Sequence, residues 1–551
     1  MSRKNKKISD EPLIVGIGAS AGGLKPLKKF FATLPDRTGM AFIVVVHLSP
    51  EHKSNLAELL QQETSLPVEQ VTKETEIKQD CIYAIPPGKL LKVGDNHIEL
   101  SESKDHRYSQ NVIDQFFRSL GNAKKSNSVG IILSGTGNDG TVGLKTIKEQ
   151  GGMIIVQQPS EAEYSGMPQS AINTGLADKI LSVEEMAAEL TKYKKSSATY
   201  REEEETESLS DTDEKIISKI LARVRAETEH DFSHYKSSTV QRRIKRRMHV
   251  THAKSFSDYL HIIKENREEA DHLYKDLLIT VTQFFRDPDS FEVLKDTIIS
   301  ELFEGKQSDD ELRIWVPGCA TGEEAYSIAM LLLEYSQQHD FPPKIQIFAT
   351  DVDEDALKIA RRGVYPESIA ADILPKRLDR FFIKEGYEYM VKEELRNIIL
   401  FARHNLLGSP PFSKLDLISC RNLLIYLDKD LQSEVFNIFH YALNAEGILF
   451  LGKSDSNLEG TDLFTTIDNK HRIYRRSSHA QSKGYSFNFP LQYNNNNRAS
   501  FPQSWNVSSA HRKTNFEHLH ERLIARDYGP PVLLLMKIMM SYMQRATFRT
   551  I

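Results

Sequence analysis

The stretch Ile14–Leu24, IVGIGASAGGL, reads as a buried strand that runs into a glycine-rich turn and then into a helix. It contains the pattern G-x-G-x-x-A, which is typical of a dinucleotide-binding loop. The same turn could instead present Ser20 as a nucleophile. The residues that follow the neighbouring strands distinguish these two interpretations.

An alternation of short apolar runs with helical patterns extends from Leu13 to about Lys194. This alternation predicts a doubly wound parallel sheet with helices on both faces. The predicted strands are LIVGIG (13–18), AFIVVVHL (41–48), CIYAI (81–85), VGIILSG (129–135) and MIIVQQ (153–158).

A second α/β unit is predicted further along the chain, after an acidic linker and a helical segment. Its strands are LRIWVPG (312–318), IQIFATD (345–351), LDLISC (415–420) and GILFLGKS (447–454). The linker carries YREEEETESLSDTDE (200–214), a like-charge block without apolar periodicity. We therefore expect a tail at 1–11, an α/β domain at 12–195, a linker at 196–213, a helical part at 214–285, an α/β domain at 286–476 and a terminal segment at 477–551.

Composition limits the classes of protein that need to be considered. A chain of 551 residues with 40% hydrophobic content is too long for one core. The net charge of -5 gives no global reason to expect nucleic acid, and no apolar run approaches the roughly 18 residues of a membrane span. The three cysteines form no C-x-x-C pair, so we expect no disulfide framework, no metal site and a cytoplasmic location.

The first glycine loop lacks a feature that a dinucleotide site needs. The strand after the first helix should end in a carboxylate that binds the ribose, but it ends in His47. Another strand end, VGIILSGTGNDG, carries Asp139. Ser20, His47 and Asp139 would all lie beyond the carboxyl ends of strands in one sheet. Each residue alone is compatible with helix capping or loop solvation, but together they favour acyl transfer.

The proposed roles follow from the three side chains. Ser20 would attack an ester or amide carbonyl, His47 would move the proton, and Asp139 would fix the imidazole tautomer. Backbone N–H groups of the glycine turns would stabilise the oxyanion.

The second glycine loop, VPGCATGEEAYSIAM (316–330), is followed by a strand that ends in Asp351. A carboxylate at this point can accept hydrogen bonds from ribose hydroxyls. The loop is not a P-loop, and Glu323 and Glu324 would repel phosphate. This combination favours a cationic nucleoside such as S-adenosylmethionine. The alternative is helix capping, in which Glu323 and Glu324 complement the N-terminus of their helix and Asp351 or Asp353 caps the following helix.

Four motifs in the N-terminal domain resemble the CheB-type protein-glutamate methylesterases across about Leu13 to Lys194. They are GASAGG (18–23), VVVHLSP (44–50), LSGTGNDG (133–140) and YSGMPQSAINTGLAD (164–178). The resemblance implies that Ser20, His47 and Asp139 form the triad and that the substrate is a glutamate methyl ester or glutamine amide on a chemoreceptor helix. Thr136 replaces a Met that is common in the family. Because the catalytic strand begins at about Leu13, we expect no preceding receiver domain and no phosphorylation switch of the usual kind.

Five ordered motifs resemble the CheR-type protein-glutamate methyltransferases across about Glu214 to Arg476. They are TVTQFFRDPDSF (280–291), VPGCATGEEAYSIAM (316–330), FATDVDEDALKIARRGVY (348–365), FARHNLL (401–407) and LDLISCRNLLIYLD (415–428). The resemblance implies S-adenosylmethionine as methyl donor, with Arg286 and Tyr426 near the methyl group. The implied cofactor contacts are Thr280, Thr282, Arg286, Glu324, Asp351, Asn405, Leu406, Cys420, Arg421 and Tyr426. The segment 381–402 is similar to the small antiparallel β-subdomain of this family.

A basic helix is predicted at STVQRRIKRRMHV (238–250). Its arginines flank an apolar stripe, so the helix could be a solvated face or a docking surface. It lacks interleaved aromatic residues, which argues against nucleic acid. We expect it to dock against an acidic receptor helix.

The sequence thus predicts a bifunctional signalling enzyme whose partner is a methyl-accepting chemoreceptor or a similar protein with glutamate-bearing helices, without nucleic acid or direct membrane insertion. Two alternatives remain, a regulatory scaffold that uses one or both sites only for binding and an esterase for small substrates. The terminal stretch ERLIARDYGPPVLLL (521–535) is similar to the start of a PAS-type domain. We expect residues 477–551 to be a truncated and mostly mobile segment.

Overall fold

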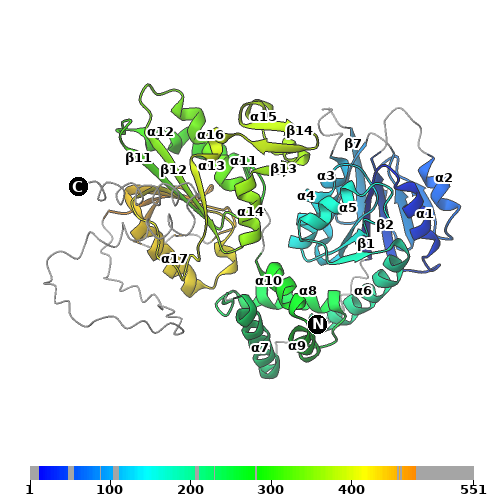
Figure 1. Cartoon of the computed structure of the whole chain (residues 1–551). Helices are drawn as coiled ribbons and strands as arrows, with labels where there is room; N and C mark the ends of the chain where they lie inside the picture. Colours follow the sequence, from blue (N-terminus) through cyan, green and yellow to red (C-terminus); the bar gives the residue numbers. More distant parts are fainter. Residues whose placement is uncertain are drawn as a thin grey trace, which may run out of the picture. The chain divides into compact units, whose positions relative to one another are not determined.

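The computed structural model describes residues 12–47, 55–86, 89–102, 111–204, 210–228, 230–278, 282–455, 458 and 462–478 (Figure 1). The chain divides into two compact units. The first contains Met1–Phe285, Gly363–Lys392 and Tyr426–Asp428, and the second contains Arg286–Arg362, Glu393–Ile425 and Lys429–Ile551. Thr280 and the predicted PAS-like segment lie outside the described residues.

The first unit begins with a seven-stranded sheet in the order β10-β9-β8-β1-β2-β5-β3, in which all neighbours are parallel. Its strands are β1 (Leu13–Ala19), β2 (Met40–Val46), β3 (Val68–Gln70), β5 (Cys81–Ala84), β8 (Ser128–Ile132), β9 (Met153–Gln157) and β10 (Lys179–Leu181). Its helices are α1 (Leu24–Ala32), α2 (Leu56–Gln61), α3 (Val112–Lys124), η2 (Lys125–Asn127), α4 (Thr141–Glu149), α5 (Gly166–Asn173) and α6 (Val183–Glu204). The five strands expected from the sequence are therefore present.

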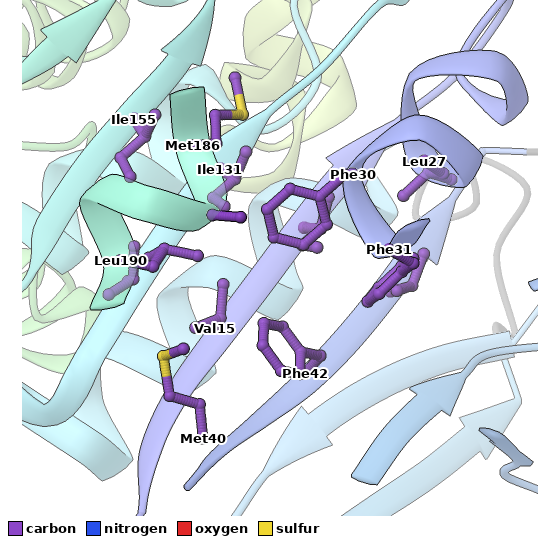
Figure 2. Close-up of a cluster of buried hydrophobic side chains, with 14 of the residues drawn as sticks. Val15, Leu27, Phe30, Phe31, Met40, Phe42, Ile131, Ile155, Met186 and Leu190 are labelled. Carbon is purple, nitrogen blue, oxygen red and sulfur yellow. The ribbon is translucent and has the colours of Figure 1, made fainter. Parts of the chain in front are cut away.

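Helices cover both faces of this sheet because the buried side chains of each strand alternate between two cores. Val15 and Ile17 belong to a core that includes residues of α1, α2 and α6. Figure 2 shows the side chains of α1 and α6 gathered over this face of the sheet. Ile14 belongs to the opposite core, which includes residues of α3, α4 and α5. The doubly wound α/β class predicted from the sequence is confirmed.

Glycines in β1 allow α3 to approach the sheet closely. A Cβ on Gly16 would lie 2.6 Å from Leu120 Cδ2, and a Cβ on Gly18 would lie 2.5 Å from Ile113 Cγ2. Both distances are shorter than real Cβ contacts. The first two glycines of the opening motif therefore have a packing role against α3.

Two features of this part differ from the sequence-based expectations. A small antiparallel sheet, in the order β4-β7-β6, was not predicted; its strands are β4 (Thr75–Glu76), β6 (Lys89–Val93) and β7 (His97–Glu102). Helix α6 continues to Glu204, into the predicted linker. The stretch is rich in Glu and Lys, which are good helix formers even without an apolar stripe.

Four helices follow in the same unit, namely α7 (Asp211–Thr228), α8 (Ser237–Thr251), α9 (Phe256–Glu265) and α10 (Arg267–Leu277). The predicted basic helix is α8, and its Val240, Ile244 and Met248 stripe is buried. Arg243, Arg246 and Arg247 are buried as well. The expectation that these three arginines form a receptor-docking face is therefore wrong, whereas Arg242 remains exposed.

The buried arginines bind acids and carbonyls of the parallel-sheet domain. Arg246 is only 3% exposed, and it pairs with Asp178 and Asp276 and donates to the Gly152 carbonyl oxygen. Lys148 pairs with the same two acids, at 2.7 Å from Asp178 and 2.9 Å from Asp276. The helical part and the parallel-sheet domain thus share one buried ion network.

The network also lowers the pKa values of its two aspartates. Burial opposes ionisation, but Arg246 and Lys148 hold the pKa of both Asp178 and Asp276 below the usual range. A depressed folded-state pKa stabilises the fold at pH values above the ordinary carboxyl pKa, and that contribution is lost as the pH falls towards the folded-state value. The contribution is therefore complete above about pH 5.

The first unit also contains a three-stranded antiparallel subdomain with the strand order β13-β15-β14. Its elements are β13 (Val364–Pro366), η4 (Glu367–Ala371), α15 (Pro375–Phe381), β14 (Phe382–Glu385) and β15 (Glu388–Val391). The subdomain begins before the predicted segment 381–402. The end of that segment was misassigned, because Ile399–Arg403 forms β16 and pairs with β12 of another sheet.

The second unit is built on a sheet in the order β16-β12-β11-β17-β18-β20-β19, which is parallel from β16 to β18 and antiparallel beyond. Its strands are β11 (Glu311–Pro317), β12 (Lys344–Asp351), β16, β17 (Leu415–Cys420), β18 (Leu443–Leu451), β19 (Phe464–Asp468) and β20 (Ile473–Arg476). Its helices are α11 (Pro288–Val293), η3 (Leu294–Ile299), α12 (Ser300–Phe303), α13 (Glu323–Ser336), α14 (Glu354–Arg362), α16 (Glu393–Arg396) and α17 (Lys429–Ala442), and η5 (Leu424–Tyr426) spans the boundary with the first unit. Among the helices that the structure describes, none is long and apolar enough to cross a bilayer.

Removal of Arg246 should destabilise the first unit strongly. Arg246→Ala leaves Asp178 and Asp276 buried with less compensating charge, which costs about 3–5 kcal/mol in the free energy of unfolding. Arg242→Ala, on the exposed side of the same helix, should change it by less than about 0.5 kcal/mol. Denaturant unfolding at neutral pH measures both values, and equal effects of the two variants would contradict the network.

Candidate functional site

The predicted serine, histidine and aspartate all follow strands that are neighbours in the first sheet. Ser20 follows β1, His47 follows β2 and Asp139 lies in the turn after β8. β1 lies between β2 and β8 and is parallel to both. The fold therefore brings these three residues to one edge of the sheet.

The turn that carries Ser20 is fixed by backbone hydrogen bonds. The Ser20 N–H donates to the Ser134 carbonyl oxygen at 3.0 Å, and the Gly23 N–H donates to the Ser20 carbonyl oxygen at 2.9 Å. The turn also packs tightly, because a Cβ on Gly135 would lie 2.9 Å from Ser20 Cβ and 2.1 Å from Met167 Sδ. Both glycine turns are thus held together at the strand ends.

A third loop joins the same arrangement. The Tyr164 N–H donates to Ser134 Oγ at 3.0 Å, and the Gly135 N–H donates to the Tyr164 carbonyl oxygen at 3.0 Å. Gln157, at the end of β9, accepts the Ser134 N–H on its side-chain oxygen. Sequence reasoning did not select Gln157, and its only signal was its position at a strand end.

His47 and Asp139 are anchored by different elements. The His47 N–H donates to the Ala19 carbonyl oxygen at 2.9 Å, and partial desolvation lowers the pKa of the imidazole. The Asp139 carboxylate accepts the N–H groups of Ile113 and Asp114 at 3.1 and 3.0 Å. Among the described residues, no direct hydrogen bond joins the side chains of Ser20, His47 and Asp139 to one another.

Ser20 and Asp139 do not serve as the helix caps that the alternative interpretation assigned to them. Gly23 and Gly140 occupy the N-cap positions of α1 and α4, so neither Ser20 nor Asp139 caps the helix that follows it in sequence. Asp139 instead binds the first amides of α3, where a helix favours negative charge.

A second buried carboxyl lies next to Asp139. Asp114 accepts the Gly143 N–H at 2.6 Å, and burial raises its pKa to about 6. Burial, together with Asp114, raises the pKa of Asp139 well above the usual range. Asp114 was not predicted as a site residue from the sequence, because it lies inside a helix and outside the motifs that resemble the two enzyme families.

In the second unit, Asp351 ties the end of β12 to the second glycine loop. Its two carboxylate oxygens accept the N–H groups of Ala320, at 2.8 Å, and Asp353, at 2.9 Å. Burial raises the pKa of Asp351 to about 6. Asp353 accepts the N–H groups of Asp355 and Ala356, so it caps α14, as the capping alternative predicted for this position.

More acids and one arginine lie near the neighbouring strand end. Glu324 accepts the Ser419 hydroxyl at 2.5 Å, and burial raises its pKa to about 7. Arg421 pairs with Asp287 at 2.8 Å and lies over the rings of Phe291 and Phe450. The Cys420 side chain is buried, and desolvation raises the pKa of its thiol.

Asp455 is a further buried acid that the motifs did not include. It accepts the N–H groups of Asn422, Ile425 and Gly452 and so holds the loop after β17. Its only sequence signal was the polar run directly after β18.

The remaining predicted cofactor contacts fall in both units. Asn405 accepts the N–H groups of Leu407 and Gly408, which orders the loop after β16, and Leu406 is buried. Arg286 belongs to the second unit, whereas Thr282 and Tyr426 belong to the first.

The acidic surroundings fit a cationic nucleoside. Asp351 ends β12 and Glu324 lies in the first turn of α13. Asp351 also accepts the N–H of Ala320, which lies between Gly318 and Gly322, two glycines with positive φ. Carboxylates accept hydrogen bonds from hydroxyl groups and attract a positive charge.

Comparison with protein families gives three matches along the chain. The CheB methylesterase model matches residues 15–190, the CheR methyltransferase all-alpha domain matches 216–278, and the CheR methyltransferase SAM-binding domain matches 280–473. These matches define a methylesterase-type α/β domain joined to a methyltransferase.

Individual relatives agree with these matches. A chemotaxis protein methyltransferase of Borreliella burgdorferi is 32% identical over 41% of this chain and 82% of its own length. A Leptospira interrogans protein named as a protein-glutamate methylesterase/protein-glutamine glutaminase is 33% identical over 31% of this chain and 89% of its own length. An uncharacterized 104.1 kDa protein of Rhodobacter capsulatus is 37% identical over 76% of this chain, and the match spans 46% of that relative.

The chain belongs to the CheB methylesterase and CheR methyltransferase families and combines a domain of each. It therefore carries both a methylesterase and a methyltransferase, and S-adenosylmethionine is the methyl donor of the latter. The two domain families together indicate a role in chemotaxis-type methylation and demethylation.

Replacement of Asp114 should change the titration of Asp139. Asp114→Asn removes the neighbouring negative charge but keeps an oxygen that can accept the Gly143 N–H, so the pKa of Asp139 should fall. Carboxyl ¹³C NMR titration of the wild-type protein and of Asp114→Asn measures the change in the pKa of Asp139. An unaltered Asp139 titration would show that the two carboxyls do not interact.

Proposed function

We propose that the protein adds methyl groups to glutamate side chains of a chemoreceptor-type partner and also removes them, with one site in each α/β domain. The observation that carries the esterase half is the arrangement of Ser20, His47 and Asp139 after three neighbouring parallel strands. The transferase half is supported by Asp351 and Glu324 beside the second glycine loop.

The esterase reaction would proceed through an acyl-enzyme. Ser20 Oγ bonds to the ester carbonyl carbon while His47 accepts its proton and then returns it to the departing methanol. Water, activated by the same imidazole, releases the glutamate carboxylate. A glutamine amide would react in the same way and lose ammonia.

The environment of the imidazole suits this role. Its lowered pKa keeps His47 neutral, and so able to accept a proton, at pH values where an ordinary histidine is partly charged. Asp139 would fix the tautomer in its ionised form. The Ile113 and Asp114 amides favour that charge, whereas burial and the Asp114 carboxyl oppose it and raise the pKa of Asp139. Backbone N–H groups of the glycine turns would stabilise the oxyanion.

Methyl transfer requires positioning more than acid–base chemistry. The bound cofactor supplies an electrophilic methyl group, and a glutamate carboxylate is already a nucleophile at neutral pH. Asp351 would accept the ribose hydroxyls, Arg286 would orient the incoming carboxylate, and Tyr426 would line the transfer path. The other proposed cofactor contacts are Thr280, Thr282, Glu324, Asn405, Leu406, Cys420 and Arg421.

The location and partner are part of the same proposal. Three buried, unpaired cysteines suit a reducing compartment, so we assign the protein to the cytoplasm. A chemoreceptor or a similar signalling protein with glutamate-bearing helices is the proposed substrate, and no nucleic acid is required. We further propose that residues 12–195 and 214–476 are the two enzymatic segments.

A regulatory scaffold remains the second candidate function, and it is favoured by the missing direct hydrogen bonds among the described side chains of Ser20, His47 and Asp139. A scaffold would bind receptor without releasing methanol. Tritiated methyl donor and receptor therefore separate the candidates, since only an enzyme yields both protein-bound label and volatile methanol.

Ser20→Ala should abolish methanol release while methyl transfer continues. Loss of the nucleophile should lower the hydrolysis rate by several orders of magnitude, because only oxyanion stabilisation and substrate binding remain. Ser165→Ala, in the neighbouring exposed loop, is the matched control and should hydrolyse at the wild-type rate. Near-normal methanol release from folded Ser20→Ala protein would remove Ser20 from the reaction.

Asp351→Ala should weaken S-adenosylmethionine binding by about 1–3 kcal/mol, because the ribose hydroxyls lose a charged acceptor. Wild-type affinity should also fall as the pH drops through about 6, where the carboxyl takes up a proton. Asp353→Ala removes the cap of α14 and a negative charge that raises the pKa of Asp351, so it should leave affinity unchanged at pH values well above 6, where Asp351 is ionised in both proteins. Calorimetry measures both variants, and equal affinities for Asp351→Ala and wild type would exclude the proposed contact.

A further inference from the structure

The β14–β15 turn of the small antiparallel subdomain lies against the glycine turn that carries Asp139. Asn138, which directly precedes Asp139, donates its side-chain N–H to the Tyr387 carbonyl oxygen at 2.9 Å. The Tyr387 ring covers Gly137, since a Cβ at Gly137 would lie 3.5 Å from Tyr387 Cδ1. A segment of the methyltransferase sequence thus borders the esterase turn.

A second contact fixes the same subdomain to the esterase helix α3. Arg118 binds Asp372 with two hydrogen bonds, at 3.2 and 3.3 Å, and both side chains are largely buried. Arg118 lies one helical turn after Asp114, the neighbour of Asp139. The subdomain is therefore held from both α3 and the glycine turn.

The subdomain has its own core, so the turn is presented by a supported structure. Tyr365, Phe381 and Phe382 are buried. The centroid of the Phe284 ring lies 5.0 Å from that of Tyr365 and 5.7 Å from that of Phe382. The Tyr387 carbonyl oxygen also accepts the Glu367 N–H at 2.9 Å, which joins the turn to the start of η4. The Tyr387 carbonyl oxygen is thus held by the Asn138 side chain and the Glu367 N–H, while the Tyr387 side chain remains largely exposed to solvent.

Aromatic side chains border the esterase turns on two sides. Tyr387 is 58% exposed, and Tyr164, whose ring would meet a Cβ on Gly22 at 2.9 Å, is 42% exposed. Gly22 follows Ser20 by two residues, and Gly137 precedes Asp139 by two. Large exposed aromatic side chains around a reactive turn are typical of a binding surface.

We propose that Tyr387 belongs to the substrate-binding surface of the esterase site, where its ring contacts the receptor segment that carries the glutamate methyl ester. This inference depends on the proposed esterase function. It makes Tyr387 a positioning residue that acts on large substrates and leaves the chemistry at Ser20 unaltered. The esterase would then use a surface element that the methyltransferase sequence supplies.

The test compares a large and a small ester on the full-length protein without methyl donor. The large substrate is a receptor fragment carrying tritiated glutamate methyl esters, and the small one is p-nitrophenyl acetate. Tyr387→Ala should raise KM for the receptor ester about tenfold, and kcat/KM for p-nitrophenyl acetate should stay unchanged. Tyr387→Phe keeps the ring and should restore the wild-type KM.

Two further variants examine the geometry. Asp372→Asn weakens the contact with Arg118 and should raise KM for the receptor ester in the same direction but by less. Ile383→Ala, on β14 and 43% exposed, is the matched control and should behave like wild type. Circular dichroism of each variant verifies the fold.

Three outcomes would overturn the inference. An unchanged KM for Tyr387→Ala would exclude a substrate contact. A faster reaction with the receptor ester would show that the turn is a cover instead of a binding surface. An equal loss with both esters would show that Tyr387 supports the Ser20 turn itself. Failure of the esterase assignment is separate, because it would appear as retained activity in Ser20→Ala.

Discussion

The close approach of α3 to β1 is the constraint on which the first site depends. It is possible only because Gly16 and Gly18 lack side chains where Leu120 and Ile113 pack against the strand. This packing places the first amides of α3 within hydrogen-bonding distance of Asp139. Larger residues at either glycine would therefore change both the core and the position of a carboxyl at the strand ends.

Glycines that have different structural roles can produce similar sequence patterns. In the first loop, the leading glycines serve packing, and the residue after the next strand is a histidine. In the second loop, Gly318 and Gly322 adopt left-handed backbone conformations, and Asp351 binds the loop amide of Ala320. The residue that follows the second strand, more than the glycines themselves, distinguishes the two sites.

The parts that the sequence predicted well are those that depend on local patterns. The buried strands of both sheets and the helix at 237–251 have clear periodicity, and all are present. The environment of that helix was not predictable, because the partners of Arg246 are Asp178, 68 residues earlier, and Asp276, 30 residues later. A row of arginines looks the same in sequence whether solvent or buried carboxylates surround it.

The candidate sites show the same division. Motifs selected Ser20, His47, Asp139 and Asp351, because each lies at or beyond the end of a strand. Asp114 and Asp455 were missed, since their importance comes from burial and from amides supplied by other segments. Residue type and spacing in the sequence do not reveal hydrogen bonds to amides of distant segments.

The buried network around Arg246 also has a consequence for the covalent connection after α6. The esterase sheet and the helical part of the methyltransferase sequence are joined by Lys148, Asp178, Arg246 and Asp276, independently of the peptide chain between them. A protease that cuts the connection would therefore produce two fragments that stay together as a noncovalent complex. The ion network alone would therefore hold the two parts together, in addition to the covalent link that the fused gene provides.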